Sequence, residues 1–455
     1  MQTQSLINQI LLLDEQPKDQ NHIPVNHGKD QMTLENPYKH GKYVIGPQFY
    51  GRVDILRCLE QDDYHGAYVI GTRQIGKTSL LREMERRLPA FYLDLNSLAD
   101  DDLAQWANYL RRSINKQRSV YKWLPDSNAI EQSDFFTLLE QAAQAAENNS
   151  QNQRIWLLLD EAEDLITAAG EHPRLLPKLR GIMGMQPNLR LVLAGYRNLL
   201  KLRQITPPQH SSPFLGGFIS FILPPLSEKE ATALIRQEQT PPCMQVEDTV
   251  VREILIETGG HPYLLQRLCN YLWHKSNLIP LDGSARFKLD GDAENIFPAD
   301  FGLLTEIEQQ ILFELCQSQE ATFAEMETLL SYKTFHLPKT LQDLVDFGFI
   351  YRTSTAYAVS SQTLTRWLRS LKYSDMPPPL SDPTVIEPHS IDEQEQHFLK
   401  LLKTHQDNLY HYEEIKAKYG FDVPLHVVNG IKIEEEAIQT LQQELAKLKA
   451  PKIDH

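Results

Sequence analysis

Short apolar runs alternate with longer amphipathic stretches from about residue 35 onward. The runs are Ala67–Ile70, Ala90–Leu95, Ile155–Leu159, Leu189–Ala194 and Phe218–Leu223. Helical spacing of apolar residues separates them, near 78–88, 101–118, 134–147 and 174–183. Strands that are almost wholly apolar are buried on both faces, and strand–helix alternation places such strands in a parallel sheet. We therefore expect an α/β domain with helices on both faces of a parallel sheet.

The rest of the chain divides where its pattern and composition change. Ser227 and Glu230 form a capping box that begins a mostly helical stretch, and a proline-rich stretch later in the chain is typical of a linker. The predicted parts are a flexible N-terminal tail at 1–34, the α/β domain at 35–225, a helical lid at 226–300, three helices and two short strands at 301–373, the linker at 374–390, and a helical module at 391–455.

The composition narrows the class of protein. The chain has 455 residues, of which 41% are hydrophobic, so it can form several buried cores. Its 60 acidic and 45 basic residues give a net charge of −15, which argues against a general binder of nucleic acid or anionic membranes. No apolar run approaches the roughly 20 residues of a membrane span, and the N-terminus lacks the features of a signal peptide. The four cysteines lack metal-binding spacing and are expected to be buried thiols in a cytoplasmic protein.

The strongest chemical motif is a glycine-rich loop. Gly71–Thr78 fits GxxxxGK[ST] and lies between an apolar run and a helical stretch, which is the context that this motif requires. Its glycines allow backbone N–H groups to point at phosphate oxygens, and the following helix adds positive potential. We expect Lys77 to bind the β- and γ-phosphates and Thr78 to bind Mg²⁺. The predicted nucleotide-binding residues of this loop are Gly71, Thr72, Arg73, Gln74, Ile75, Gly76, Lys77, Thr78 and Ser79.

A pair of carboxylates follows the apolar run at 155–159. A strand that ends in Asp160 and Glu161 is a weak signal alone and a strong one in the same α/β domain as the glycine loop. Asp160 is predicted to hold Mg²⁺, directly or through water. Glu161 is predicted to orient or deprotonate the water that attacks the γ-phosphate. The next acids, Glu163 and Asp164, are interpreted as solvated residues at a helix start.

Arg197 is the third candidate for chemistry. It follows the apolar run at 189–194, in the sequence Gly195-Tyr196-Arg197. The strand beside the phosphate loop can place a polar residue near the γ-phosphate, so Arg197 is predicted to sense that phosphate or stabilise the transition state. The alternative is an ordinary surface arginine in a loop.

Several further motifs resemble those of the STAND ATPases, signal-transducing relatives of AAA+ proteins. The resemblance covers roughly 35–373 and includes the sequence Leu-Leu-Leu-Asp-Glu-Ala-Glu-Asp-Leu that ends in the carboxylates above. It also includes Asn36-Pro37-Tyr38, Gly46-Pro47, Phe49-Tyr50-Gly51-Arg52, Ser212-Pro213-Phe214, Pro225-Leu226-Ser227 and, most specifically, Gly259-Gly260-His261-Pro262-Tyr263-Leu264-Leu265. By itself, the Gly-Gly-His-Pro stretch is also compatible with a simple capped helix start.

The resemblance implies a mechanism and partners. Gly51 and Arg52 would lie against the adenine and ribose, and Pro262 would contact the base and couple the lid to bound ADP or ATP. The protein would be a conditionally oligomerising switch with slow ATP hydrolysis, in bacterial defence or stress signalling. The usual effector and sensor domains of such proteins are not evident in this sequence, so they would be absent or supplied by partner proteins.

Residues 301–373 are predicted to form a winged helix. Such a domain can bind DNA, which suggests an alternative: a DNA-associated AAA+ loader or transposition regulator. Phosphate contacts supply much of the affinity for DNA, yet this segment carries six basic and eight acidic residues. A packing role against the ATPase domain is therefore favoured over nucleic-acid binding.

The last predicted helices, at about 392–419 and 424–449, carry narrow apolar stripes. The stripe residues are Leu409, Tyr412, Ile415 and Tyr419, and then Ile431, Ile438, Leu441, Leu445 and Leu448. Stripes of this width either pack on each other as a hairpin or dock on the helices of a partner. These helices are the predicted connection to an effector or sensor protein.

Overall fold

The protein is described here from a computed structural model, which divides into two compact units, Met1–Ser370 and Leu371–His455. The described residues are 36–39, 41–61, 64–98, 103–126, 130–149, 153–203, 214–240, 243–274, 277–278, 296–330 and 337–371, with scattered positions after residue 400. The predicted tail at 1–34 and linker at 374–390 lie outside these residues.

A five-stranded parallel sheet forms the centre of the first unit. Its order is β2-β3-β4-β1-β5, so that β1, which leads into the glycine loop, lies between β4 and β5. The strands are β1 (Gly66–Ile70), β2 (Ala90–Asp94), β3 (Ile155–Asp160), β4 (Leu189–Gly195) and β5 (Ile219–Ile222). Every residue of β1, β3 and β4 is buried, as expected for strands with helices on both faces.

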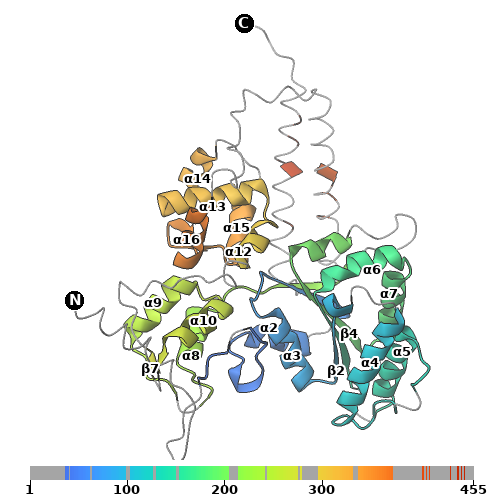
Figure 1. Ribbon diagram of the computed structural model, residues 1–455. Coiled ribbons are helices and arrows are strands. Elements are labelled where there is room, and N and C mark those ends of the chain that lie inside the picture. The colour runs from blue at the N-terminus through green and yellow to red at the C-terminus, as the bar shows by residue number, and fades with distance from the viewer. Residues whose placement is uncertain are drawn as a thin grey trace, which may run out of the picture. The chain divides into compact units, whose positions relative to one another are not determined.

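Helices cover the two faces of this sheet (Figure 1). On one face, α2 (Val53–Gln61) and α3 (Lys77–Arg87) share a hydrophobic cluster with Trp156 and Leu158 of β3. The alternate residues of β3 point to the opposite face. The helices on that opposite side in Figure 1 are α4 (Leu103–Arg118), α5 (Phe135–Glu147) and α7 (Leu175–Met185).

The prediction of an α/β domain is confirmed, and so are the strands and helices that were predicted for it. Each predicted apolar run coincides with a strand, and each predicted helix of this domain begins and ends within two residues of an observed one. Local signals explain this accuracy. Asp134, for example, caps α5 by accepting the backbone N–H groups of Phe136 and Thr137, both at 2.9 Å.

Three further helices, α8 (Glu228–Ile235), α9 (Asp248–Thr258) and α10 (Pro262–Leu272), form the α8–α10 segment. The predicted capping box of Ser227 and Glu230 begins α8. Two tyrosines from near the start of the described chain, Tyr38 and Tyr50, are buried in the hydrophobic core of this segment. Residues far apart in the sequence therefore build one core here.

The α12–α16 segment completes the first unit. It consists of α12 (Ile296–Phe301), α13 (Glu306–Ser318), β8 (Glu320–Thr322), α14 (Phe323–Leu329), α15 (Leu337–Asp346), β9 (Ile350–Arg352), β10 (Ala356–Val359) and α16 (Gln362–Ser370). The strands form a small antiparallel sheet in the order β8-β10-β9. The sequence suggested only two strands, because β8 is three residues long and carries no apolar run. The winged-helix interpretation of this segment stays a prediction.

In the second unit, only isolated positions are described. Among the predicted stripe residues, Leu409, Ile431, Ile438 and Leu445 are helical, and Ile431 and Leu445 are buried. The spacing of seven residues between Ile431, Ile438 and Leu445 is that of a helix with a narrow apolar face.

The structure bears on two expectations from the sequence, one about membrane-spanning segments and one about the cysteines. None of the helices within the described ranges is long and apolar enough to cross a membrane. Of the cysteines, Cys269 and Cys316 are buried, Cys58 is half-buried and Cys243 is exposed, so the expectation of uniformly buried thiols was wrong for Cys243.

Candidate functional site

The glycine loop, Gly71–Gly76, connects β1 to α3 at the carboxyl edge of the sheet. Gly76 has a φ of 106°, which side-chain-bearing residues rarely adopt. A Cβ atom at Gly71 would lie 2.9 Å from Ile75 Cγ2, so this position also has no room for a side chain. Both glycines of the motif are therefore required by the backbone of the loop itself.

Lys77 begins α3 and folds back over the loop. Its Nζ donates to the carbonyl oxygens of Gly71 and Thr72, both at 3.0 Å, and lies 3.8 Å from the centre of the Tyr196 ring. Burial lowers the pKa of Lys77, while the carboxylates of Glu161 and Asp300 oppose that shift. A phosphate group that binds Lys77 must compete with these contacts.

Asp160 and Glu161 lie where β3 ends. Asp160 is 2% exposed and accepts the Tyr92 hydroxyl at 2.8 Å. Glu161 has a left-handed backbone with a φ of 49°, so the chain turns sharply after the strand. Burial, helped by Glu163, raises the pKa of Glu161 to about 7. A carboxylate with a pKa near neutrality is suited to act as a general base.

The interpretation of Glu163 as a solvated acid was wrong. Its carboxylate accepts the backbone N–H of Tyr196 at 3.4 Å, and burial raises its pKa. It occupies the space beside Gly195, where a Cβ atom would collide with its oxygen. Nothing in the local sequence indicates this contact, because Tyr196 lies 33 residues further along the chain.

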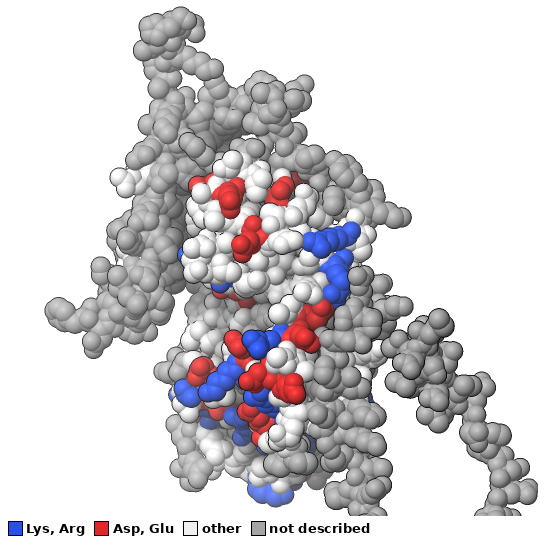
Figure 2. Space-filling view, turned by 90° about the vertical axis from the view of Figure 1, so that its left-hand side faces the viewer, with Lys and Arg blue, Asp and Glu red and all other residues white. Residues whose placement is uncertain are grey.

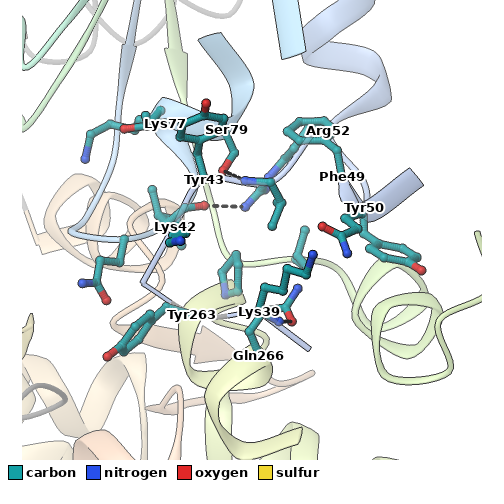
Figure 3. Close-up of a pocket in the computed structure, with 18 of the residues that line it drawn as sticks. Lys39, Lys42, Tyr43, Phe49, Tyr50, Arg52, Lys77, Ser79, Tyr263 and Gln266 are labelled. Atoms are coloured by element: carbon teal, nitrogen blue, oxygen red, sulfur yellow. Dashed lines mark hydrogen bonds between the residues drawn. The ribbon is translucent and has the colours of Figure 1, made fainter. Parts of the chain in front are cut away.

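A cavity of about 290 Å³ lies beside the loop (Figure 3). The predicted site residues that line it are Arg52, Gln74, Ile75, Gly76, Lys77, Thr78, Ser79, Glu161 and Pro262. Aromatic side chains of Tyr43, Phe49, Tyr50 and Tyr263 form another part of its wall. A cavity with apolar walls and a few polar groups at one end is typical of a small-molecule site, and its volume is close to the lower limit for such sites.

The turn at Gly51 and Arg52 is held by the α8–α10 segment. Arg52 has a φ of 64°, and its backbone N–H donates to Glu230 Oε1 at 3.0 Å. Gly51 has a φ of 73°, and a Cβ atom there would lie 2.5 Å from the same oxygen. Arg52 therefore lines the cavity, whereas Gly51 contacts Glu230 and does not line it. Sequence reasoning identified Glu230 only as a helix cap and missed this second contact.

Glu83 of α3 anchors the chain that leads to this turn. Its carboxylate accepts the Gly46 backbone N–H at 2.8 Å and pairs with Arg86 and Arg87 at 2.7 and 2.8 Å. These hydrogen bonds, chiefly the one from Arg86, lower the pKa of Glu83 to about 2 in spite of burial.

Replacing Glu83 with glutamine should reduce the free energy of unfolding at neutral pH by about 2 kcal/mol, since hydrogen bonds to a charged group are lost. Because the folded-state pKa lies below the ordinary value of 4.5, the stabilisation is complete above pH 4.5 and disappears as the pH falls toward 2. Urea titrations of the wild type and E83Q between pH 3 and 7 measure this. A constant difference between the two proteins across that range would contradict the assignment.

The Gly259-Gly260-His261-Pro262 stretch joins three parts of the first unit. Gly259 and Gly260 have φ values of 59° and 75°, and Pro262 is the first residue of α10. A Cβ atom at Gly259 would lie 2.6 Å from the carbonyl oxygen of Ser360, and one at Gly260 would lie 2.5 Å from that of Leu226. The stretch is a helix cap, as its simplest interpretation held, and it is also a tight packing point.

Arg73 of the glycine loop is bound through its main chain from two directions. Its N–H donates to Asp300 Oδ2 of α12 at 2.8 Å, and its carbonyl oxygen lies 3.1 Å from His261 Nε2. Because a carbonyl oxygen can only accept, Nε2 carries the proton and donates. Burial lowers the pKa of His261 to about 4, so the ring is neutral at pH 7. Burial raises the pKa of Asp300 to about 6. The α8–α10 and α12–α16 segments thus both hold the phosphate loop.

Arg197 does not line the cavity. Its Nη1 lies 2.8 Å from Glu308 Oε1 of α13, and its guanidinium lies 4.9 Å from the centre of the Phe347 ring. The Glu308 side chain is 3% exposed and also caps α13 through Thr305. The sequence predicted a phosphate-facing arginine, whereas this structure places the arginine in a salt bridge with a helix of another segment.

The remaining predicted residues lie close to the cavity without lining it. The carbonyl oxygens of Gly71 and Thr72 face Lys77, and Asp160 lies beside Tyr92. The polar partners that sequence reasoning missed are Tyr92, Glu163, His261, Asp300 and Glu308. Of these, Glu163 and His261 belong to motifs that the sequence had singled out.

The residues present fit a magnesium ion that is bound together with a nucleotide. Thr78 lines the cavity, Asp160 is the last residue of β3, and Glu161 follows it. Among the residues described by the structure, no three His, Cys, Asp or Glu side chains are placed to hold a metal by themselves. Mg²⁺ at a phosphate loop does not need such a cluster, since it uses one or two protein ligands together with phosphate oxygens and water.

Comparisons with known proteins yield similar solved structures only. No family model and no curated protein matches the chain. A Walker-type ATPase of Pyrococcus abyssi is 16% identical, with 73% of this chain and 99% of that one covered and a TM-score of 0.49. The ORC2 protein of Aeropyrum pernix is 13% identical, with coverage of 74% and 96% and a TM-score of 0.43. A STAND protein with a tetratricopeptide repeat sensor from Pyrococcus horikoshii is 14% identical, with coverage of 88% and 53% and a TM-score of 0.31.

The sheet order and the loop define the class of this protein. A strand in the middle of a parallel sheet leads through Gly71–Gly76 into a helix that begins with Lys77 and Thr78, and an adjacent part of the sheet edge carries Asp160 and Glu161. This is the arrangement of an α/β P-loop NTPase core.

Proposed function

We propose that the protein is an ATP- and ADP-dependent switch of the STAND ATPase type. It binds nucleotide with Mg²⁺ in the cavity beside the glycine loop, hydrolyses ATP slowly, and couples its nucleotide state to assembly or to recruitment of a partner. The observation that carries this proposal is the salt bridge between Arg197 and Glu308. It ties the loop after β4 to the α12–α16 segment, so that opening this segment and freeing Arg197 are the same event.

The chemistry follows from the residues around the cavity. Lys77 binds the β- and γ-phosphates, and the backbone N–H groups of the glycine loop surround them. Thr78 and Asp160 would hold Mg²⁺, which would supply positive charge to the phosphates. Glu161 orients the attacking water and accepts its proton.

The closed arrangement explains why turnover would be slow. Arg197 is held by Glu308, and the main chain of Arg73 is held by Asp300 and His261. In this conformation Arg197 is paired with Glu308 and is not available to stabilise a transition state. A trigger that separates the α12–α16 segment from the core would release the arginine and permit nucleotide exchange.

The freshly purified protein should contain nearly one equivalent of ADP. A closed switch retains its product, because release requires the segments around the cavity to separate. Denaturation followed by chromatography of the released nucleotide measures this, and K77A should be empty. An empty wild-type site that turns over ATP many times per second would contradict the proposal.

A DNA-associated AAA+ machine is the second candidate, and the α12–α16 segment is the feature that favours it. The helices and the small sheet of this segment have the order expected of a winged helix. Among the described residues on the face drawn in Figure 2, basic and acidic side chains are interspersed. Stimulation of ATP hydrolysis by duplex DNA, with binding that weakens steeply as salt rises, would favour this candidate.

Partner recruitment is assigned to the second unit. Ile431 and Leu445 are buried within helices of that unit, and Ile438 lies half-buried between them in the sequence. We assign these helices to the binding of an effector or sensor protein, in the setting of bacterial defence or stress signalling that the sequence resemblance implies. Conditional assembly with further copies of the chain belongs to the same proposal.

A further inference from the structure

Tyr92 contacts the predicted magnesium-binding carboxylate from the neighbouring strand. Its hydroxyl donates to Asp160 Oδ2 at 2.8 Å. We propose that Tyr92 is a positioning residue for Mg²⁺: by occupying Oδ2, it fixes the orientation in which Asp160 presents its carboxylate to the ion. The inference rests on the proposed function, because it requires that Asp160 takes part in binding Mg²⁺ with a nucleotide.

The register of the sheet brings the two side chains together. Strand β2 pairs in parallel with β3, with Tyr92 opposite Leu158 and Asp94 opposite Asp160. Residues two apart in a strand point to the same face, so Tyr92, Leu158 and Asp160 share the face that α3 covers. The lysine and the threonine of the phosphate loop begin that same helix.

Asp160 has little freedom of its own. It is 2% exposed, and its Oδ1 accepts the backbone N–H of Glu161 at 3.2 Å. With the Tyr92 hydroxyl on Oδ2, both carboxylate oxygens have a donor, and rotation of the carboxylate would break both hydrogen bonds. Carboxylates that bind metals are commonly oriented in this way by partners outside the coordination sphere.

The tyrosine is itself held in place from α3. The guanidinium of Arg82 lies 3.4 Å from the centre of the Tyr92 ring, and Arg82 Nη1 donates to Glu85 Oε2 at 2.8 Å. Burial and the nearby Asp160 raise the pKa of Tyr92, so the phenol remains protonated and acts as the donor. Glu85, Arg82, Tyr92 and Asp160 therefore form a connected chain from the phosphate-loop helix to the carboxylate.

The variant Y92F removes only the hydroxyl. The assay titrates Mg²⁺ and follows the binding of a fluorescent ADP analogue. We expect the Mg²⁺ concentration at half of the full effect to be about tenfold higher, or more, in Y92F than in the wild type. Binding measured in excess EDTA should not change, because the phosphate loop and the aromatic wall of the cavity are intact. Y64F is the matched control, since Tyr64 is also buried and its hydroxyl donates to the carbonyl oxygen of Leu59 outside the site.

A double-mutant cycle separates positioning from a purely structural role. If Tyr92 acts through Asp160, Y92F will not alter the Mg²⁺ dependence further in a D160N background. If Y92F melts too low to be studied, R82K is the second variant, since it removes the planar group from the tyrosine ring. A smaller rise in the Mg²⁺ requirement is then expected.

The outcomes distinguish this inference from the proposed function. Unchanged Mg²⁺ dependence in Y92F, or in R82K where Y92F cannot be studied, overturns the role of Tyr92. An equal effect of Y92F in the wild-type and D160N backgrounds also overturns it. Wild-type protein that binds nucleotide with no dependence on Mg²⁺, or binds none, overturns the proposed function instead.

Discussion

Replacing Glu308 with glutamine is expected to accelerate the release of bound ADP by about thirtyfold. The Glu308 carboxylate is buried and pairs with Arg197. Loss of the charge weakens this contact by about 2 kcal/mol, and every 1.4 kcal/mol corresponds to about a factor of ten in an equilibrium constant. If closure limits release, the whole difference is visible in the rate at which excess ATP displaces a fluorescent ADP analogue.

E325Q is a matched control for this variant. Glu325 caps α14 through Thr322 with the same capping box that Glu308 forms with Thr305. Its carboxylate is exposed, accepts hydrogen bonds from Thr322, and forms no salt bridge with an arginine among the residues that the structure describes. E325Q should therefore release ADP at the wild-type rate, and E308Q and R197Q should show non-additive effects when they are combined. Equal rates in E308Q and the wild type would show that the salt bridge does not hold the closed state.

Replacing Glu161 with glutamine should reduce the rate of ATP hydrolysis by about a hundredfold to ten-thousandfold, which is the usual contribution of a general base. Glu161 lines the cavity with Lys77, and glutamine has nearly the same shape but cannot accept the proton. Binding of ATP and ADP should be retained. Single-turnover hydrolysis of radiolabelled ATP, measured beside equilibrium binding, separates these two properties.

E163Q controls for the loss of a neighbouring negative charge. Glu163 lies two residues away and is half-buried, but its carboxylate faces the backbone of Tyr196 and does not line the cavity. Its replacement should change hydrolysis far less than E161Q does. If E163Q abolished hydrolysis while E161Q left it intact, the assignment of the base would be wrong. If both proteins hydrolysed ATP normally, the carboxylates after β3 would have no catalytic role.

Much of the nucleotide-binding core could be predicted because its signals are local. The fully apolar strands, the two glycines and the lysine of the loop, and the acids at the end of β3 each lie within a few residues of one another. Asp134 and Ser227 mark helix starts through hydrogen bonds that span only two or three positions. Interactions of this range depend on backbone geometry that is the same in any fold.

The contacts that sequence reasoning did not reveal have one physical cause. Glu163 and Arg197 look solvated or phosphate-facing when only their neighbours in the sequence are considered. In the structure, Glu163 contacts the backbone of Tyr196, and Arg197 contacts Glu308, which is 111 residues away. The partner of a polar side chain depends on which surface packs against it. The hydrophobic periodicity of the sequence does not identify that surface.

The sequence by itself therefore determined the P-loop core, the order of its helices and strands along the chain, and the place of the glycine loop between β1 and α3. The tertiary structure decided which distant residues contact that site. Asp300 reaches the Arg73 N–H across 227 positions and His261 reaches the Arg73 carbonyl oxygen across 188, while Tyr92 meets Asp160 across 68. The physical reason is that backbone preferences and hydrophobic periodicity depend on residues that are close in the sequence. Directed polar contacts between segments form only when those segments are packed together.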